Sequence, residues 1–206
     1  MSISYPISLP SAPVPKTSRF TMSSAVAVSE SPFTFEQQAQ VHQGQRWRVQ
    51  LTFPPMPRSN AEQIVGTLAK LNGREGTILI GDYDGRTPRG IATGTPLVNG
   101  GAQTGNSLAT KGWTAGKTGI LLRGDYLQLG SGATARLYKV LDDANSDGSG
   151  NATFTIWPNL RSSPSDGAAI VVSNTVSVFR LNSSEVPWDA NEVSVYGLTF
   201  AADEAL

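Results

Sequence analysis

The chain has 206 residues, no cysteine and one histidine, and its 16 basic residues are balanced by 16 acidic ones. The lack of cysteine excludes disulfides, thiolate nucleophiles and cysteine-ligated metal centres, and the balanced charge gives no global attraction to nucleic acid or to an anionic membrane. Charged residues make up only 16% of the chain, below the usual quarter of a soluble domain, so much of the exterior is uncharged or is covered by other subunits.

The chain begins with a segment, up to about residue 17, that we expect to be an extended arm ordered against a neighbouring molecule. Prolines disfavour a helix and a central strand there: Pro6, Pro10, Pro13 and Pro15. The segment lacks the basic and apolar regions of a secretion signal, and no apolar stretch approaches the roughly 20 residues of a membrane-spanning helix. Strands are predicted next over residues 19–29 and 33–39.

The segment from Gln45 to Phe53 alternates apolar and polar side chains. This pattern predicts a strand with Trp47, Val49 and Leu51 on the same face as Phe53. Prolines follow at once and end the strand, because proline lacks the backbone donor that a sheet needs.

A helix is predicted over residues 59–72. Ser59 and Glu62 have the spacing of a capping box, and Gly73 marks the end of the helix. An apolar stripe lies between these signals: Ile64, Val65, Leu68 and Leu71. A short apolar strand, residues 77–80, follows, so the sequence predicts one main helix packed on a sheet.

The character of the chain changes after about residue 90. Residues 90–119 are rich in Gly, Thr, Asn and Ala, which predicts exposed loops and short irregular strands. A denser β region follows, with strands predicted at 120–129, 135–141, 152–157, 168–172 and 176–181. The last alternating segment, 193–200, resembles the early strands. We therefore predict a discontinuous first domain, residues 1–90 plus 183–206, that carries an inserted β domain, residues 91–182.

Three short motifs have a functional and a structural interpretation. Residues 112–118 approach a phosphate loop, but the interval between the glycines is one residue short and no helix follows, which favours a glycine-rich turn. Residues 143–148 open like a calcium loop, but its twelfth position is Phe154, which favours a hairpin turn. Arg123-Gly124-Asp125 lies between two strand-like runs, where a bulge or tight turn explains the glycine.

The sequence contains few candidate catalytic residues. His42 is the only histidine, and its place in a Gln-rich run indicates a solvated turn. Asp82 with Asp84, and Asp142 with Asp143, are carboxylate pairs of the kind used in glycoside hydrolysis, but both lie in turn-like sequence, where aspartate is common. We predict no catalytic residue, no cofactor and no metal site.

The tryptophans are better candidates for binding. Trp47 and Trp157 lie in alternating strands and are predicted core residues. Trp113 and Trp188 lie in loop-like sequence beside a glycine and a proline, which predicts that they are exposed or buried at a subunit contact. Stacking on a sugar is the competing use of these two residues.

Several segments together resemble structural tail proteins of long-tailed bacteriophages, with distal tail or minor tail proteins of the tail tip as the nearest: 45–55, the helix that ends in Leu71-Asn72-Gly73, 124–130, 136–140 and 156–161. The resemblance covers roughly residues 40–200, and its motifs are short and structural. It implies a mainly β fold with one main α-helix, in which a β-barrel or sandwich related to the tail-tube fold carries the inserted β domain. In some relatives such an insert resembles a carbohydrate-binding module.

The resemblance also implies a function and no catalytic residues. We expect a structural virion protein of the tail tip, made in the host bacterial cytoplasm, that forms a ring, commonly a homohexamer, between the tail tube protein and the baseplate hub with its receptor-binding parts. No nucleic-acid sequence recognition and no membrane insertion are expected. The alternatives are a carbohydrate-binding or host-recognition module that uses Trp113 or Trp188, and a hydrolase that acts on the cell wall.

Overall fold

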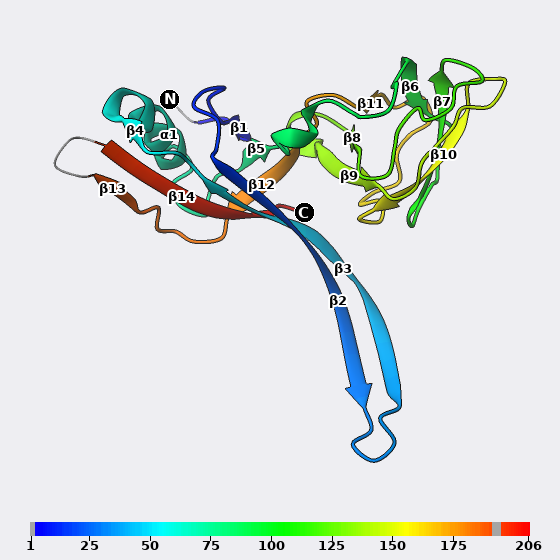
Figure 1. Ribbon diagram of the computed structural model, residues 1–206, viewed down its shortest axis with the longest axis horizontal. Helices are drawn as coiled ribbons and strands as arrows, with labels where there is room; N and C mark the ends of the chain where they lie inside the picture. Colours follow the sequence, from blue (N-terminus) through cyan, green and yellow to red (C-terminus); the bar gives the residue numbers. More distant parts are fainter. Residues whose placement is uncertain (1–2, 191–194) are drawn as a thin grey trace.

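The computed structural model describes residues 3–190 and 195–206, and within these residues it is mainly β with a single α-helix (Figure 1). The expected fold class, mainly β with one main helix, is confirmed. Two lobes lie side by side, a sheet of eight strands that the helix accompanies and a nearly closed barrel of six strands.

The first lobe, called the first sheet below, contains strands from both ends of the chain: β1 (Ile7–Ser8), β2 (Thr17–Glu30), β3 (Gln37–Thr52), β4 (Met56–Pro57), β5 (Ile78–Ile80), β12 (Ser177–Leu181), β13 (Trp188–Ala190) and β14 (Val195–Glu204). Its order is β1-β5-β12-β14-β3-β2, and β4 and β13 also pair with β14. Neighbours are antiparallel except β1 and β5.

The predicted strand 45–53 forms the inner half of β3, between β14 and β2, and β3 ends one residue earlier, at Thr52. Trp47, Val49, Leu51 and Phe53 are all buried in one core cluster, which confirms the alternation read from the sequence. The helix α1 (Arg58–Ala69) packs on the same core through Ile64 and Leu68, among others.

The helix differs from the prediction at both ends, since it begins at Arg58 and its α-helical part ends before residue 72. The predicted capping box is wrong, because Pro57 is the N-cap and no side chain caps the helix. Glu62 instead accepts a hydrogen bond from Arg58 Nε at 3.2 Å. Among the described residues, no helix has the length and apolar character needed to cross a bilayer.

The barrel is built from β6 (Gly94–Val98), β7 (Ser107–Trp113), β8 (Tyr126–Leu129), β9 (Arg136–Val140), β10 (Ala152–Trp157) and β11 (Ile170–Val171). Two short 3-10 helices, η1 (Asp84–Arg86) and η2 (Gly132–Thr134), flank these strands. The strand order is β11-β8-β9-β10-β7-β6, and the two ends meet where Val98 N donates to Ala168 O at 2.9 Å. The barrel has its own core, separate from that of the first sheet.

One domain boundary predicted from the sequence needs correction. β12 was expected inside the insert, 91–182, but it pairs with β5 and β14 in the first sheet. Four of the five residues of β12 are buried, and such an apolar run suits either sheet, so its pattern alone does not assign the strand. The region 90–119, expected to hold exposed loops and short irregular strands, contains the short strands β6 and β7, which pair with a register shift between Gly94 and Leu97.

The N-terminal segment packs on its own chain, which corrects the expectation that it needs a neighbour. β1 pairs with β5 in parallel, and the Tyr5 hydroxyl donates to Lys70 O at 2.7 Å. Ile7 and Leu9 pack against the core of the first sheet. The prolines around β1 are tolerated because β1 is an edge strand.

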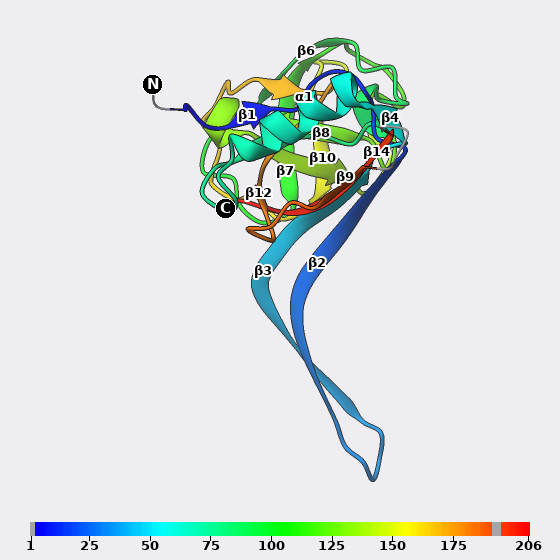
Figure 2. The ribbon, with the colours of Figure 1, turned by 90° about the vertical axis from the view of Figure 1, so that its left-hand side faces the viewer.

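A long hairpin, β2 with β3, projects from the body (Figures 1 and 2). Its strands are paired from Thr17 and Thr52 at the foot to Glu30 and Gln37 near the tip. The predicted strand 19–29 is confirmed as β2. The predicted strand at 33–39 is wrong at its start, because residues 31–36 form the turn at the tip, and His42 lies in a strand instead of the expected turn.

Candidate assembly surface on a projecting hairpin

The hairpin displays large apolar side chains to solvent. Phe33 is 92% exposed and Val41 is 76% exposed. Six such side chains lie along it: Met22, Val26, Val28, Phe33, Phe35 and Val41. Scattered apolar residues are ordinary on a protein surface, but a contiguous apolar patch indicates a surface that another molecule covers.

The strand register places Val26, Val28 and Val41 on one face of the distal hairpin, defined as residues 24–45, and Phe33 and Phe35 lie in its turn. Paired residues share a face of the ribbon, and successive residues alternate between faces. The apolar face is therefore formed by two cross-strand pairs, Val26 with Val41 and Val28 with Ala39. The opposite face carries small and uncharged polar side chains from the intervening pairs, Ala27 with Gln40 and Ser29 with Gln38.

The distal hairpin also has two free edges. β2 is the last strand of the first sheet, and β3 pairs with β14 only over residues 48–52. Within the described residues, no third strand pairs with the distal hairpin. Unpaired edge N–H and C=O groups accept further strands, and a two-stranded ribbon with one apolar face is marginal in water. The distal hairpin therefore leaves two hydrogen-bonding edges and one apolar face open to contact.

The foot of the hairpin is fixed to both lobes. The Trp47 backbone N–H donates to Glu204 Oε2 at 3.1 Å, and the indole Nε1 donates to Leu137 O of β9 at 2.9 Å. The Trp157 ring meets the Trp47 ring edge to face, with 4.6 Å between centroids. The fully buried Glu204 carboxylate also accepts from Arg161 Nη2 at 2.5 Å. These contacts hold the hairpin in a defined direction.

The two candidate tryptophans are far from equivalent. Trp113 is in β7, only 4% exposed, with its Nε1 donating to Thr110 Oγ1 at 2.8 Å. The expectation that it is exposed or lies at a subunit contact is wrong, because its ring packs on Phe154 inside the barrel. Trp188, on β13 of the first sheet, is 53% exposed. The structure therefore leaves only Trp188 available for a subunit or glycan contact.

The short motifs are used within the fold. Asp125 of the Arg-Gly-Asp tripeptide is buried and accepts backbone N–H groups of Arg89, Gly90 and Leu122 at 2.8–3.0 Å. Asp147, in the loop that joins β9 to β10, accepts the N–H groups of Ser149 and Asn151, each at 2.8 Å. These local bonds lower the pKa of Asp147 and account for the residue as part of a turn.

One cluster of titratable groups joins the lobes. The Tyr126 hydroxyl donates to Asp82 Oδ2 at 2.9 Å, and Lys139 Nζ donates to the same hydroxyl at 2.9 Å. Burial, and then the Asp82 carboxylate, raise the pKa of Tyr126, whereas burial lowers the pKa of Lys139. The cluster connects the end of β5 to β8 and β9. The sequence pairs Asp82 only with its neighbour Asp84, because Tyr126 and Lys139 are distant from Asp82 in the chain.

Within residues 3–190 and 195–206, no group of three or more His, Cys, Asp or Glu side chains is arranged to hold a metal ion. His42 stands exposed on β3. A scan against models of protein families gives no match, and a search of curated proteins gives none either.

Proposed function

We propose that this chain is a structural subunit of a symmetric assembly, and that the assembly is a ring at the tail tip of a long-tailed bacteriophage. The hairpin carries this proposal. It displays an apolar face and two unpaired edges on a rigid foot, and an isolated molecule gains nothing from such a ribbon. The sequence resemblance to distal and minor tail proteins supports the choice of assembly.

In the proposed ring, the hairpin of each copy crosses the body of the next copy, which covers its free edges and its apolar face. Closure of the ring then leaves no hairpin uncovered. The hairpins line a central channel, and their apolar faces pack against the bodies of neighbouring copies. The ring is commonly a hexamer in the resembling proteins, and cyclic symmetry satisfies every copy in the same way.

The barrels lie outside the channel in this arrangement. The tail tube protein binds one side of the ring, and the baseplate hub with the receptor-binding parts binds the other. The protein acts by holding shape, and we propose no reaction, cofactor or metal for it.

The location can be tested with antibodies against the barrel, used with gold labels on phage particles that contain this chain. The proposal expects label at the distal end of the tail in a small, constant number per particle. Label on the head, along the whole tail, or only on free protein would overturn it.

A second candidate function, glycan binding by the tail tip, is favoured by the exposed ring of Trp188. A glycan array of the full chain tests it, with Trp188→Ala as the variant. The buried Trp113 offers no accessible face, so only the change at Trp188 should abolish a glycan signal without unfolding the chain. Absence of any signal, or a signal that survives Trp188→Ala, removes this candidate.

A further inference from the structure

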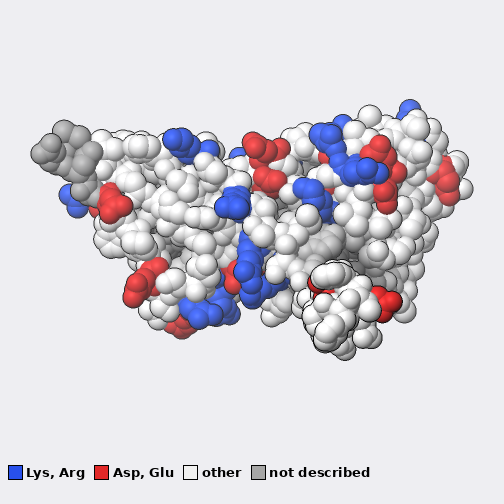
Figure 3. Space-filling model, turned by 60° about the horizontal axis from the view of Figure 1, so that its bottom comes forward, with Lys and Arg blue, Asp and Glu red and all other residues white. Residues whose placement is uncertain are grey.

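The outer face of the first sheet carries a group of arginines that we call the arginine face: Arg19, Arg46, Arg48, Arg74 and Arg180. They line two adjoining depressions around Asn182, at the foot of the hairpin. Figure 3 shows basic side chains in the middle of this side of the molecule, beside a projection at the lower right that shows none of them.

Few acids neutralise the arginine face. Asp203 lies 3.5 Å from Arg46 and 3.6 Å from Arg48, and it is 28% exposed. Glu204 also borders the face, but its carboxylate is buried and paired with Arg161. The guanidinium of Arg180 is held in place by donating to the carbonyls of residues 74 and 75 at 2.6 and 2.7 Å. The face therefore has an excess of fixed positive charge.

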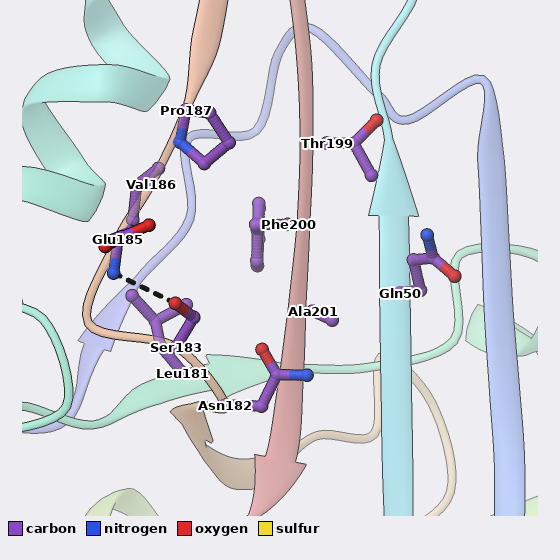
Figure 4. Close-up of a pocket in the computed structure, with 10 residues that line it drawn as sticks. All are labelled: Gln50, Leu181, Asn182, Ser183, Glu185, Val186, Pro187, Thr199, Phe200 and Ala201. Carbon is purple, nitrogen blue, oxygen red and sulfur yellow. Dashed lines mark hydrogen bonds between the residues drawn. The ribbon is translucent and has the colours of Figure 1, made fainter.

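A third depression, with a volume of about 330 Å³, adjoins the arginine face and shares Asn182 with it. Its walls are partly apolar, from Leu181, Val186, Pro187 and Phe200. Figure 4 shows these side chains between β14 and the segment that leads to β13, with Glu185 at the margin. An apolar side chain with an acidic neighbour fits this combination, the first in the depression and the second on the arginines.

The tip of the hairpin, residues 31–36, has that chemistry. It carries the exposed rings of Phe33 and Phe35. Glu30 and Glu36 flank the rings and are the only charged residues between positions 24 and 45. The turn is closed by hydrogen bonds from Ser31 N to Glu36 O at 3.0 Å and from Phe35 N to Ser31 O at 2.9 Å. The tip is thus an acidic, aromatic knob with a defined shape.

The tip cannot reach the arginine face of its own chain, because the hairpin extends away from the sheet in both ribbon views (Figures 1 and 2). We infer that the hairpin tip of one copy docks on the arginine face of another copy. Glu30 and Glu36 lie against the arginines, and a phenylalanine ring enters the adjoining depression. This contact joins two different patches, so its repetition closes a ring or extends a stack. The inference rests on the proposed function and names the surface by which copies meet.

A charge exchange tests the contact. The tip variant is Glu30→Lys with Glu36→Lys, and the face variant is Arg19→Glu with Arg48→Glu. All four side chains are exposed, and the ion pair that Arg48 makes with Asp203 lies at the surface, so a single copy should keep its fold. Each variant places like charges at the contact, so each alone should lose the oligomer in sedimentation velocity at low ionic strength.

Two further samples restore opposite charges at the contact between tip and face. In an equimolar mixture of the variants, the basic tips meet faces that have gained two carboxylates, and the acidic tips meet unchanged arginine faces. The mixture should therefore form oligomers in which the two chains alternate. A chain with all four substitutions should assemble alone. Salt weakens the wild-type contact, because exposed charges are screened beyond about 8 Å at physiological ionic strength.

The outcomes separate the contact from the wider proposal. If the wild type and both variants assemble alike, the ring stands and the tip contact is overturned. A wild type that stays monomeric at every concentration contradicts both. If the variants lose assembly but neither the mixture nor the fourfold variant recovers it, charge complementarity between tip and face is refuted. Double-stranded DNA that binds the wild type, is lost in the face variant, and leaves self-association unchanged would assign the arginines to nucleic acid instead.

Discussion

Removal of the distal hairpin should abolish assembly without disturbing the fold of the body. Ser24 and Gln45 are a cross-strand pair, so replacing residues 25–44 by Asn-Gly closes the shortened ribbon with a two-residue turn of the favoured type. Neither core cluster contains a residue between positions 24 and 45. The free energy of unfolding of the monomer should therefore change by only about 0.5 kcal/mol.

The loss of association should be much larger. Five apolar side chains leave with the segment, and their exposed fractions in the single chain run from 47% at Val26 to 92% at Phe33. Burying each against a neighbour is worth about 1–2 kcal/mol, or roughly 5–10 kcal/mol for each copy before the cost of ordering. Each 1.4 kcal/mol is about tenfold in an association constant, so the oligomer should vanish at any practical concentration.

Sedimentation velocity measures the assembly, and calorimetry at a concentration where both chains are monomeric measures the fold. A matched control is Gln38→Ser with Gln40→Ser, which changes the polar face of the same ribbon and leaves its edges and apolar face intact. The reasoning is refuted if the shortened chain assembles like the full one. It is also refuted if the shortened chain no longer folds, since the body would then depend on the segment.

Three further predictions concern the body of the protein. Glu204→Gln removes one partner of the buried pair with Arg161 and should destabilise the chain by about 3–5 kcal/mol in urea unfolding; an unchanged midpoint would contradict this. Trp113→Ala should cost about 3–5 kcal/mol because it empties part of the barrel core, whereas Trp188→Ala should cost less than about 1 kcal/mol, and equal effects would refute the assignment. The folded state raises the pKa of Tyr126 above its ordinary value of 10.0, so the unfolded state loses this proton first and the free energy of unfolding should fall above pH 10. Tyr126→Phe should weaken this fall in urea unfolding measured across alkaline pH. An identical pH profile for the variant and the wild type would contradict the prediction.

The sequence was most informative where a segment buries one face. The alternation around Trp47 predicted both the strand and its buried side chains, and the apolar spacing around Ile64 predicted the helix against them. These patterns work because burial of one face imposes a period on the side chains. The capping-box prediction was wrong because Pro57, and not Ser59, is the N-cap of the helix.

The candidate surface was harder to predict, since the distal hairpin buries neither face within one chain. The Gln-rich run through His42 has no apolar alternation that would indicate a strand. It is a strand because it pairs with β2. The location of Trp113 was predicted wrongly because the neighbouring Gly112 is typical of a turn in sequence. Gly112 has a φ of 84° but lies in strand β7. A Cβ at Gly112 would approach Thr95 O to 2.4 Å, so the glycine permits strand pairing there.

The most direct test of the account is electron cryomicroscopy of the purified full chain at a concentration where it self-associates. We predict closed rings with a central channel, hairpins from every copy along that channel, and barrels at the outside. Single copies with hairpins free in solvent at every concentration, or an assembly held together with the hairpins pointing outward and uncovered, would contradict the claim that this chain works by completing its hairpin with other copies.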